Sequence, residues 1–230
     1  MLRYTQNLLR FAVTIIDLNW QKPILKSNES KGLKPILRYS VCWFIMDTEV
    51  CWHGRGGQGA VTANEILAES VIYSGKYAKA FPEFGPERMG APIRAFARIS
   101  DKPVRIHTQV YEPDIVIVID PTLIGKIDVA KGLKEGGVIL ANFVGTPAEL
   151  QKAIGTKAEC HTVDATRIST EELGRPMVNT SMLGALIKIR PLIPYDEMED
   201  HITSKFEGKL SDKMIVKNLM ALKRAYMEVE

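Results

Sequence analysis

The chain has 230 residues with ordinary hydrophobic and charged fractions and a formal net charge of +3 at pH 7, which fits a soluble protein with one sizeable core. Residues 1–45 hold seven Lys or Arg against two acidic residues, so the remainder is slightly acidic and no nucleic-acid-binding face is expected on it. The three cysteines form no C-x-x-C pair, so the usual spacing of iron–sulfur and zinc ligands is missing. Reduced thiols in a cytoplasmic protein are expected, and no bound metal.

The N-terminal segment, residues 1–45, differs from the rest of the chain. Its apolar run, residues 8–16, is interrupted by Arg10 and is too short to span a membrane, so no membrane association is expected. Met46 directly precedes the first ordered pattern. We therefore expect residues 46–230 to form a single domain, and residues 1–45 to be an over-extended reading of the gene. The alternative is a genuine flexible arm that docks on a partner.

Strand and helix patterns alternate from Met46 onward. The predicted strands are residues 49–52, 76–81, 91–99, 104–109, 114–120, 138–142 and 160–164, with 91–99 and 104–109 paired as a hairpin. Within the segment 114–120, an unbroken β-branched run lies between Asp114 and Asp120, which is typical of a central strand covered on both faces. The predicted helices are residues 60–73, 179–189, 194–206 and 211–228. This order predicts an α/β fold: a mostly parallel, Rossmann-like sheet with an inserted hairpin and a helical C-terminal tail.

The glycine-rich turn between the first strand and the first helix is the clearest functional signal. Four glycines, Gly54, Gly56, Gly57 and Gly59, leave the backbone open to a ligand just before a helix begins. Free N–H groups and the helix dipole at that point favour an anion, most often phosphate. Arg55 and Gln58 project beside the turn.

Residues 81–92 follow the second predicted strand and should lie near the same edge of the sheet. This proline-rich segment has two equally weighted interpretations. It is a structural connection with solvated charges, or it is a second wall of the pocket with Arg88 or Arg94 meeting an anionic group.

The spacing of Gly54, Gly56 and Gly59 also satisfies G-x-G-x-x-G, so a free-standing NAD-dependent oxidoreductase is the alternative function. That function needs an acid after the second strand, and Glu83 is the nearest candidate. No catalytic residue is predicted: the four histidines lie in separate elements, and no P-loop lysine follows the glycines. A phosphate seat without a catalyst suggests a ligand-binding partner of a larger enzyme.

Four longer motifs stand out along the chain: HGRGGQGA at residues 53–60, AFPEFGPERMGAP at 80–92, PDIVIVIDP at 113–121 and NTSMLGA at 179–185. Together they resemble the gamma subunit of the 2-oxoacid:ferredoxin oxidoreductases, and most of all the pyruvate:ferredoxin oxidoreductase (pyruvate synthase) branch. The resemblance spans residues 49–223 and leaves residues 1–45 outside it.

The resemblance implies a subunit that binds coenzyme A and is not active alone. It would present the CoA thiol to an acyl-thiamine intermediate on other subunits, giving acetyl-CoA, CO2 and reduced ferredoxin. Thiamine pyrophosphate and iron–sulfur clusters would belong to partner subunits (alpha, beta and delta), with ferredoxin as electron acceptor. Pyruvate and branched 2-oxoacids both stay open as substrates. The implied CoA-binding residues are Gly54, Arg55, Gly56, Gly57, Gln58 and Gly59, with Glu83, Arg88 and Arg94 as further candidates.

Overall fold

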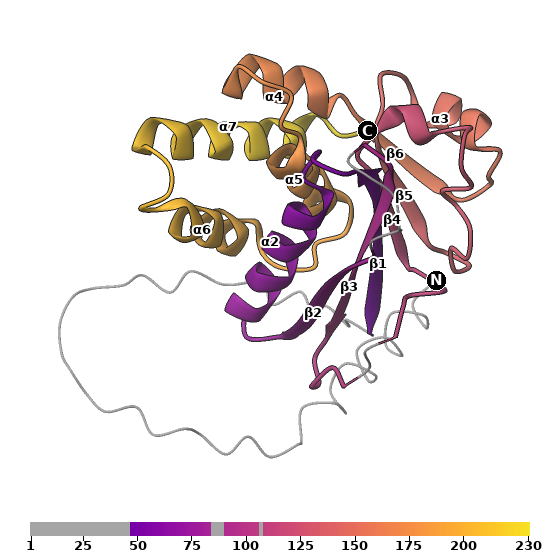
Figure 1. The fold of residues 1–230 in the computed structure, drawn as a ribbon, viewed down its shortest axis with the longest axis horizontal. Coiled ribbons are helices and arrows are strands. Elements are labelled where there is room, and N and C mark those ends of the chain that lie inside the picture. Colours follow the sequence, from indigo (N-terminus) through magenta and orange to yellow (C-terminus); the bar gives the residue numbers. More distant parts are fainter. Residues whose placement is uncertain (1–46, 84–89, 106–107) are drawn as a thin grey trace, which may run out of the picture. The chain divides into compact units, whose positions relative to one another are not determined.

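The structure is a computed structural model that describes residues 47–83, 90–105 and 108–230. The predicted N-terminal extension lies outside these residues. The described residues form one six-stranded sheet with helices on both of its faces (Figure 1). The strands are β1 (Thr48–Arg55), β2 (Tyr77–Glu83), β3 (Pro92–Ser100), β4 (Ile115–Val118), β5 (Val138–Asn142) and β6 (Glu159–Val163). The helices are α2 (Ala60–Tyr73), α3 (Pro147–Ile154), α4 (Ala165–Leu173), α5 (Asn179–Ile189), α6 (Tyr195–Phe206) and α7 (Asp212–Glu228), with a 3-10 turn η1 (Pro121–Leu123).

The strand order is β2-β3-β1-β4-β5-β6. β1, β4, β5 and β6 pair in parallel, whereas β3 runs antiparallel to both β1 and β2. The sheet is therefore mostly parallel, as the sequence predicts. At the β6 edge, Thr162 and the last residue, Glu230, exchange two backbone hydrogen bonds of 3.1 and 3.0 Å. β2 is the strand at the opposite edge.

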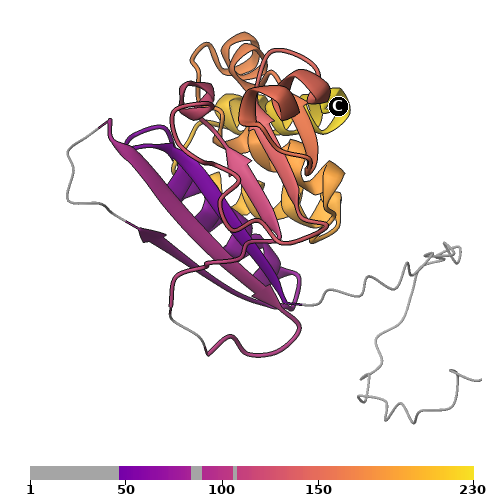
Figure 2. The same ribbon diagram turned by 90° about the vertical axis from the view of Figure 1, so that its right-hand side faces the viewer.

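The sheet is buried on both faces because alternate residues of each strand point to opposite sides. Val50 and Trp52 of β1 face the core shared with α2, α5, α6 and α7, while Cys51 faces a second core that includes Leu150 of α3. All four residues of β4 are buried, which confirms the predicted central strand. Figure 2 shows the second face of the sheet, with the C-terminal helices behind it.

The inserted hairpin forms, but its partner strand differs from the prediction. β3 pairs with β2 on one side and with β1 on the other, so neither of its edges is open to residues 104–109. The described residues of that segment, 104–105 and 108–109, are not strand. They are held by a side chain instead: Arg98 donates from its guanidinium to the carbonyl oxygens of Thr108 (2.5 Å) and Gln109 (2.8 Å).

The predicted helices are confirmed, and two more are present. α2 and α5 have the predicted bounds, and α6 and α7 each begin one residue later than predicted. The short helix α3 connects β5 to β6, and α4 follows β6 and leads to α5. α3 begins with a capping box in which Thr146 accepts from the N–H of Glu149 while Glu149 accepts from the N–H of Thr146. None of the helices in the described residues is long and apolar enough to cross a lipid bilayer.

Candidate functional site

The glycine loop, residues 56–59, connects β1 to α2 at the carboxyl end of the parallel strands. β1 runs as far as Arg55, so Gly54 belongs to the strand, where a Cβ would lie 3.1 Å from the Cβ of Ala60. Gly59 is the N-cap of α2 and has φ +86°, a conformation that disfavours any side chain. The sequence prediction of a bare backbone turn opening onto a helix is thus confirmed.

Asp120 braces this loop from the neighbouring strand. It follows β4, which pairs in parallel with β1, and its side chain is only 4% exposed. One carboxylate oxygen, Oδ2, accepts from Arg55 Nε at 2.8 Å and from Gln58 Nε2 at 2.9 Å. The other, Oδ1, accepts from the N–H of Thr122 at 2.8 Å. Burial acts to raise the pKa of Asp120, but the hydrogen bonds from Gln58, Thr122 and Arg55 outweigh it and hold that pKa below its ordinary value.

The two side chains predicted to project beside the loop are therefore engaged within the protein. Arg55 also donates to the carbonyl oxygen of Gly90 (3.0 Å) and to Thr122 Oγ1 (3.2 Å). Gln58 Oε1 accepts from the N–H of Arg55 at 2.8 Å. The N–H of Gly56 donates to the carbonyl oxygen of Ala91 at 3.2 Å. These contacts place the end of the 81–92 segment beside the glycine turn, as the sequence predicts.

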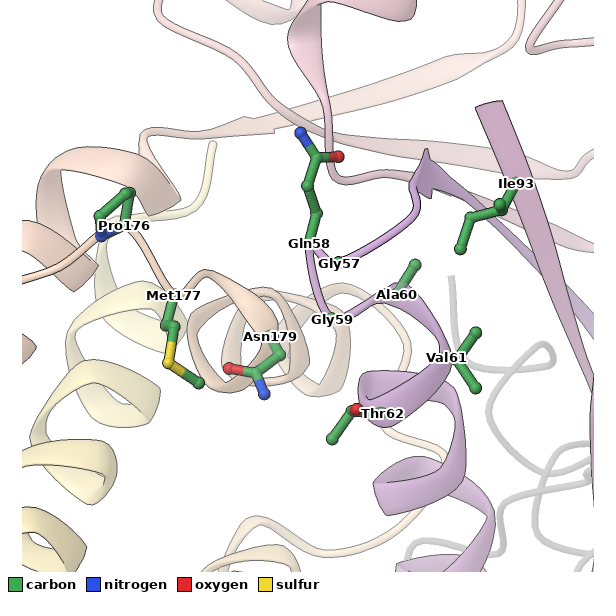
Figure 3. Close-up of a pocket in the computed structure, with 10 residues that line it drawn as sticks. All are labelled: Gly57, Gln58, Gly59, Ala60, Val61, Thr62, Ile93, Pro176, Met177 and Asn179. Atoms are coloured by element: carbon green, nitrogen blue, oxygen red, sulfur yellow. The ribbon is translucent and has the colours of Figure 1, made fainter. Parts of the chain in front are cut away.

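A pocket of about 350 Å³ opens on the helical side of the loop (Figure 3). Its lining comes from the loop, from the first turn of α2, from β3 and from the start of α5: Gly57, Gln58, Gly59, Ala60, Val61, Thr62, Ile93, Pro176, Met177 and Asn179. Thr62 and Asn179 flank its opening, whereas the side chain of Gln58 points away from both (Figure 3).

Two helices begin at this pocket, and neither is capped by a side chain. The N-cap of α2 is Gly59 and that of α5 is Val178. In the described part of the chain, no acceptor meets the N–H groups of Ala60, Val61 and Thr62. Asn179 is 5% exposed and lies against Gly59. A Cβ added at Gly59 would be 3.4 Å from the Cβ of Asn179. Its Oδ1 accepts from the N–H of Thr180, which leaves the amide NH2 as the donor half of the side chain.

None of the ten residues that line the pocket is charged. The donors that face it are backbone and amide N–H groups at two helix N-termini, an arrangement that favours an anion over a cation. The role of Asn179, Met177 and Pro176 was not predicted from the sequence. Asn179 opens a motif that carries the family resemblance, but nothing local shows that it faces the glycine loop.

Glu83 and Arg94 lie on the other face of the sheet. They are register partners in the β2–β3 ladder and form an ion pair of 2.6 Å. Arg94 alternates with Ile93, so it lines a different pocket, of about 210 Å³, together with Cys51 and His53. The structure thus does not bring Glu83 and Arg94 to the lining of the glycine-loop pocket. Arg88 lies outside the described residues.

Cys51 and His53 do not form a nucleophile and base. Their side chains are buried, with Sγ 3.5 Å from Nε2, and His53 Nδ1 has no hydrogen-bond partner. Burial raises the pKa of the Cys51 thiol to about 12. Burial, reinforced by the positive charge of Arg94, lowers the pKa of His53 to about 4. Both groups are therefore neutral at neutral pH, and neither is activated for catalysis.

The described residues hold no group of three or more His, Cys, Asp or Glu that could bind a metal ion. The acidic residue that usually binds the ribose of a dinucleotide is also not in its usual place among the described residues. In the dinucleotide-binding fold an acidic residue follows the second strand, which lies beside β1 and parallel to it. Here the antiparallel β3 takes that place, and Glu83, at the end of β2, pairs with Arg94.

Fold and site together define an α/β protein with a mostly parallel sheet and an uncharged pocket beside a glycine loop at the start of α2. The family model for pyruvate ferredoxin/flavodoxin oxidoreductase matches residues 49–228. The chain belongs to this family, and it is a gamma-type subunit of a multi-subunit oxidoreductase.

Relatives and solved structures agree with this assignment. The chain is 51% identical over 166 residues (72% of this chain, 90% of the relative) to the pyruvate/ketoisovalerate oxidoreductases common subunit gamma of Thermococcus litoralis. It is 48% identical over 182 residues (79% and 97%) to the pyruvate synthase subunit PorC of Methanothermobacter marburgensis. The crystal structure of the pyruvate oxidoreductase subunit PORC (EC 1.2.7.1) from Thermotoga maritima matches with a TM-score of 0.72 and 41% identity, covering 80% of this chain and 97% of that one.

A longer protein shares the fold. The 2-oxoglutarate:ferredoxin oxidoreductase from Magnetococcus marinus, solved with 2-oxoglutarate, coenzyme A and succinyl-CoA bound, matches with a TM-score of 0.65 and 17% identity. The match covers 79% of this chain and 30% of that chain, so the same fold occurs there as one part of a larger polypeptide.

Proposed function

We propose that this chain is the coenzyme A-binding gamma subunit of a cytoplasmic pyruvate (2-oxoacid):ferredoxin oxidoreductase. The observation that carries the proposal is the meeting of two uncapped helix N-termini, those of α2 and α5, at one pocket beside a bare glycine loop. Coenzyme A is a phosphate-rich substrate of the reaction class. Gly54, Gly56, Gly57 and Gly59 would let its phosphate-bearing part approach the backbone, with Arg55 and Gln58 completing the loop.

The role of the chain in the reaction is to bind and to position. Holding coenzyme A by its phosphates places the thiol where the acyl group on the partner subunits is formed, and converts thiol attack into an effectively intramolecular step. Thiamine pyrophosphate and iron–sulfur clusters on the alpha, beta and delta subunits would supply the oxidative decarboxylation and pass electrons to ferredoxin. Glu83, Arg88 and Arg94 remain predictions of the sequence as additional contacts.

Thr62 allows a sharp test of this site. It is the third residue of α2, it is exposed, and it lines the pocket. A glutamate at this position is favoured by the helix dipole, so Thr62→Glu should not destabilise the helix, yet its charge would repel a phosphate. We expect the KM for coenzyme A in the assembled complex to rise at least about tenfold, equivalent to roughly 1.4 kcal/mol, with the KM for the 2-oxoacid unchanged.

The neutral variant Thr62→Gln is the matched control, because it has nearly the same size and no charge. Its KM for coenzyme A should stay within about threefold of the wild-type value, a change of under 1 kcal/mol. Equal KM values for the Thr62→Glu variant and the wild type would place coenzyme A elsewhere and refute the site.

A further inference from the structure

The glycine loop has a conformational problem that its own sequence does not solve. Glycines order at a high entropic cost, and Gly57 and Gly59 have φ values of +92° and +86°. If the loop had to become ordered each time a ligand bound, the ligand would bind more weakly by the free energy of that ordering. Something outside the loop has to hold it in the open conformation that faces the pocket.

Asp120 is placed to do so. It lies on the neighbouring strand connection rather than in the loop, and it is not among the residues that line the pocket. Its Oδ2 accepts hydrogen bonds from the first and last residues of the run 55–58, namely Arg55 and Gln58. The bond from the Arg55 N–H to Gln58 Oε1 closes a ring around the turn.

Asp120, Gly90 and Thr122, the partners in these contacts, do not line the pocket, although Gln58 itself does. The Gln58 side chain points away from Thr62 and Asn179 (Figure 3). Three of the five guanidinium donors of Arg55 meet Asp120, Gly90 and Thr122. The ion pair is also well shielded, since the Asp120 side chain is 4% exposed and that of Arg55 27%.

We propose that Asp120 is a positioning residue for the coenzyme A site. It acts through Arg55 and Gln58, which serve as loop braces, and it touches no ligand. The inference rests on the proposed function, because it assumes that the pocket beside the loop takes the phosphate-bearing part of coenzyme A.

The first test is Asp120→Asn in the assembled complex. The amide keeps the size of the side chain but offers a single acceptor oxygen, so it cannot serve both Thr122 and the Arg55–Gln58 pair. We expect the KM for coenzyme A to rise about tenfold, the scale of a lost charge-assisted hydrogen bond. The kcat at saturating coenzyme A and the KM for the 2-oxoacid should stay at wild-type values. An unchanged KM for coenzyme A would overturn the proposal.

Asp114→Asn is the matched control, because the two aspartates lie at opposite ends of the same strand. Asp114 immediately precedes β4, and Asp120 lies beyond the other end of β4. Asp114 accepts from the N–H of Glu49 (2.7 Å) and from Lys134 Nζ (3.0 Å), far along the strand from the glycine loop. It tests for a general effect of loosening β4. A rise in the KM for coenzyme A equal to that of Asp120→Asn would assign the effect to stability and overturn the positioning role.

A double-mutant cycle separates bracing from direct contact. Gln58→Ala removes one brace at an exposed position, so this variant should fold even where Asp120→Asn assembles poorly. We expect Gln58→Ala to raise the KM for coenzyme A and the double variant to be no worse than Asp120→Asn alone, because both remove the same brace. Two results would contradict the proposal. The first is a KM for coenzyme A in the double variant that has risen by the product of the two single effects, and the second is an unchanged KM in Gln58→Ala.

The Thr62→Glu variant distinguishes this failure from failure of the proposed function. A raised KM for coenzyme A in Thr62→Glu with a normal KM in Asp120→Asn leaves the site in place and refutes only Asp120. A normal KM in Thr62→Glu refutes the site itself and, with it, the role of Asp120.

Discussion

At the scale of single residues, His53 is a buried group beside the glycine loop whose pKa is strongly lowered. It sits in β1 directly before Gly54, is 6% exposed, and has one ring nitrogen without a partner. Its neutrality has an energetic consequence. The folded state lowers the pKa of His53 from 6.5 to about 4, so between these two values the unfolded chain takes up a proton that the folded chain refuses.

This predicts a loss of stability in mild acid. The contribution of His53 is fully present above about pH 6.5 and is lost as the pH falls toward 4, by roughly 3 kcal/mol in total. In His53→Gln the free energy of unfolding should depend less steeply on pH over this range. Urea denaturation of wild type and variant at several pH values measures the difference in slope. Identical slopes would show that the ring is not held neutral.

Residues also mark the limit of what the sequence predicts about the site. The bare glycine turn and its place before a helix follow from local pattern alone. The partner of Arg55 does not, because Asp120 is 65 positions away and meets it only through the parallel register of β1 and β4. For the same reason Asn179 could not be assigned to the pocket, although its motif was recognised.

At the scale of elements, the crossing of α5 and α7 depends on one glycine. Gly184 lies inside α5, and a Cβ added there would stand 2.0 Å from the carbonyl oxygen of Leu222 in α7. Two backbones therefore touch at this point. Because α5 also carries Asn179, the contact fixes the second wall of the pocket.

For Gly184→Ala, the sign of the change in the free energy of unfolding tests whether the two helices are in close contact. At an unconstrained helix position alanine would stabilise by up to about 1 kcal/mol. Here we expect destabilisation of about 2–4 kcal/mol, because the helices must separate. Thermal unfolding of the purified chain measures it, and a Tm equal to or above that of wild type would show that the crossing is not tight.

Helices and strands were predicted where neighbouring residues in the sequence determine them. Helix α2 follows from the spacing of its apolar residues, and β4 from its β-branched run. The hairpin was assigned to the wrong partner because strand pairing is decided by which edges are free, and the pairing of β3 with both β1 and β2 is not visible in residues 100–109. The short helix α3 was overlooked although Thr146 and Glu149 have the spacing of a capping box.

At the scale of the whole molecule, the chain is a gamma-type subunit, and the proposed function has it bind coenzyme A while partner subunits carry the redox chemistry. The family assignment and the uncharged pocket lead to one expectation for the isolated chain. It should bind coenzyme A measurably by calorimetry, show no binding of NADH, and support no 2-oxoacid oxidation. Activity should appear only with the partner subunits. Saturable NADH binding with hydride transfer by this chain alone would restore the dinucleotide alternative.

The edge strand β2 has a consequence for how such a complex is joined. Pro82, opposite Ala95, has no N–H, and prolines are tolerated within a sheet where the missing donor faces outward. A foreign strand laid along β2 would meet a gap in the row of donors. Continuation of the sheet from one polypeptide into the next is therefore disfavoured along β2.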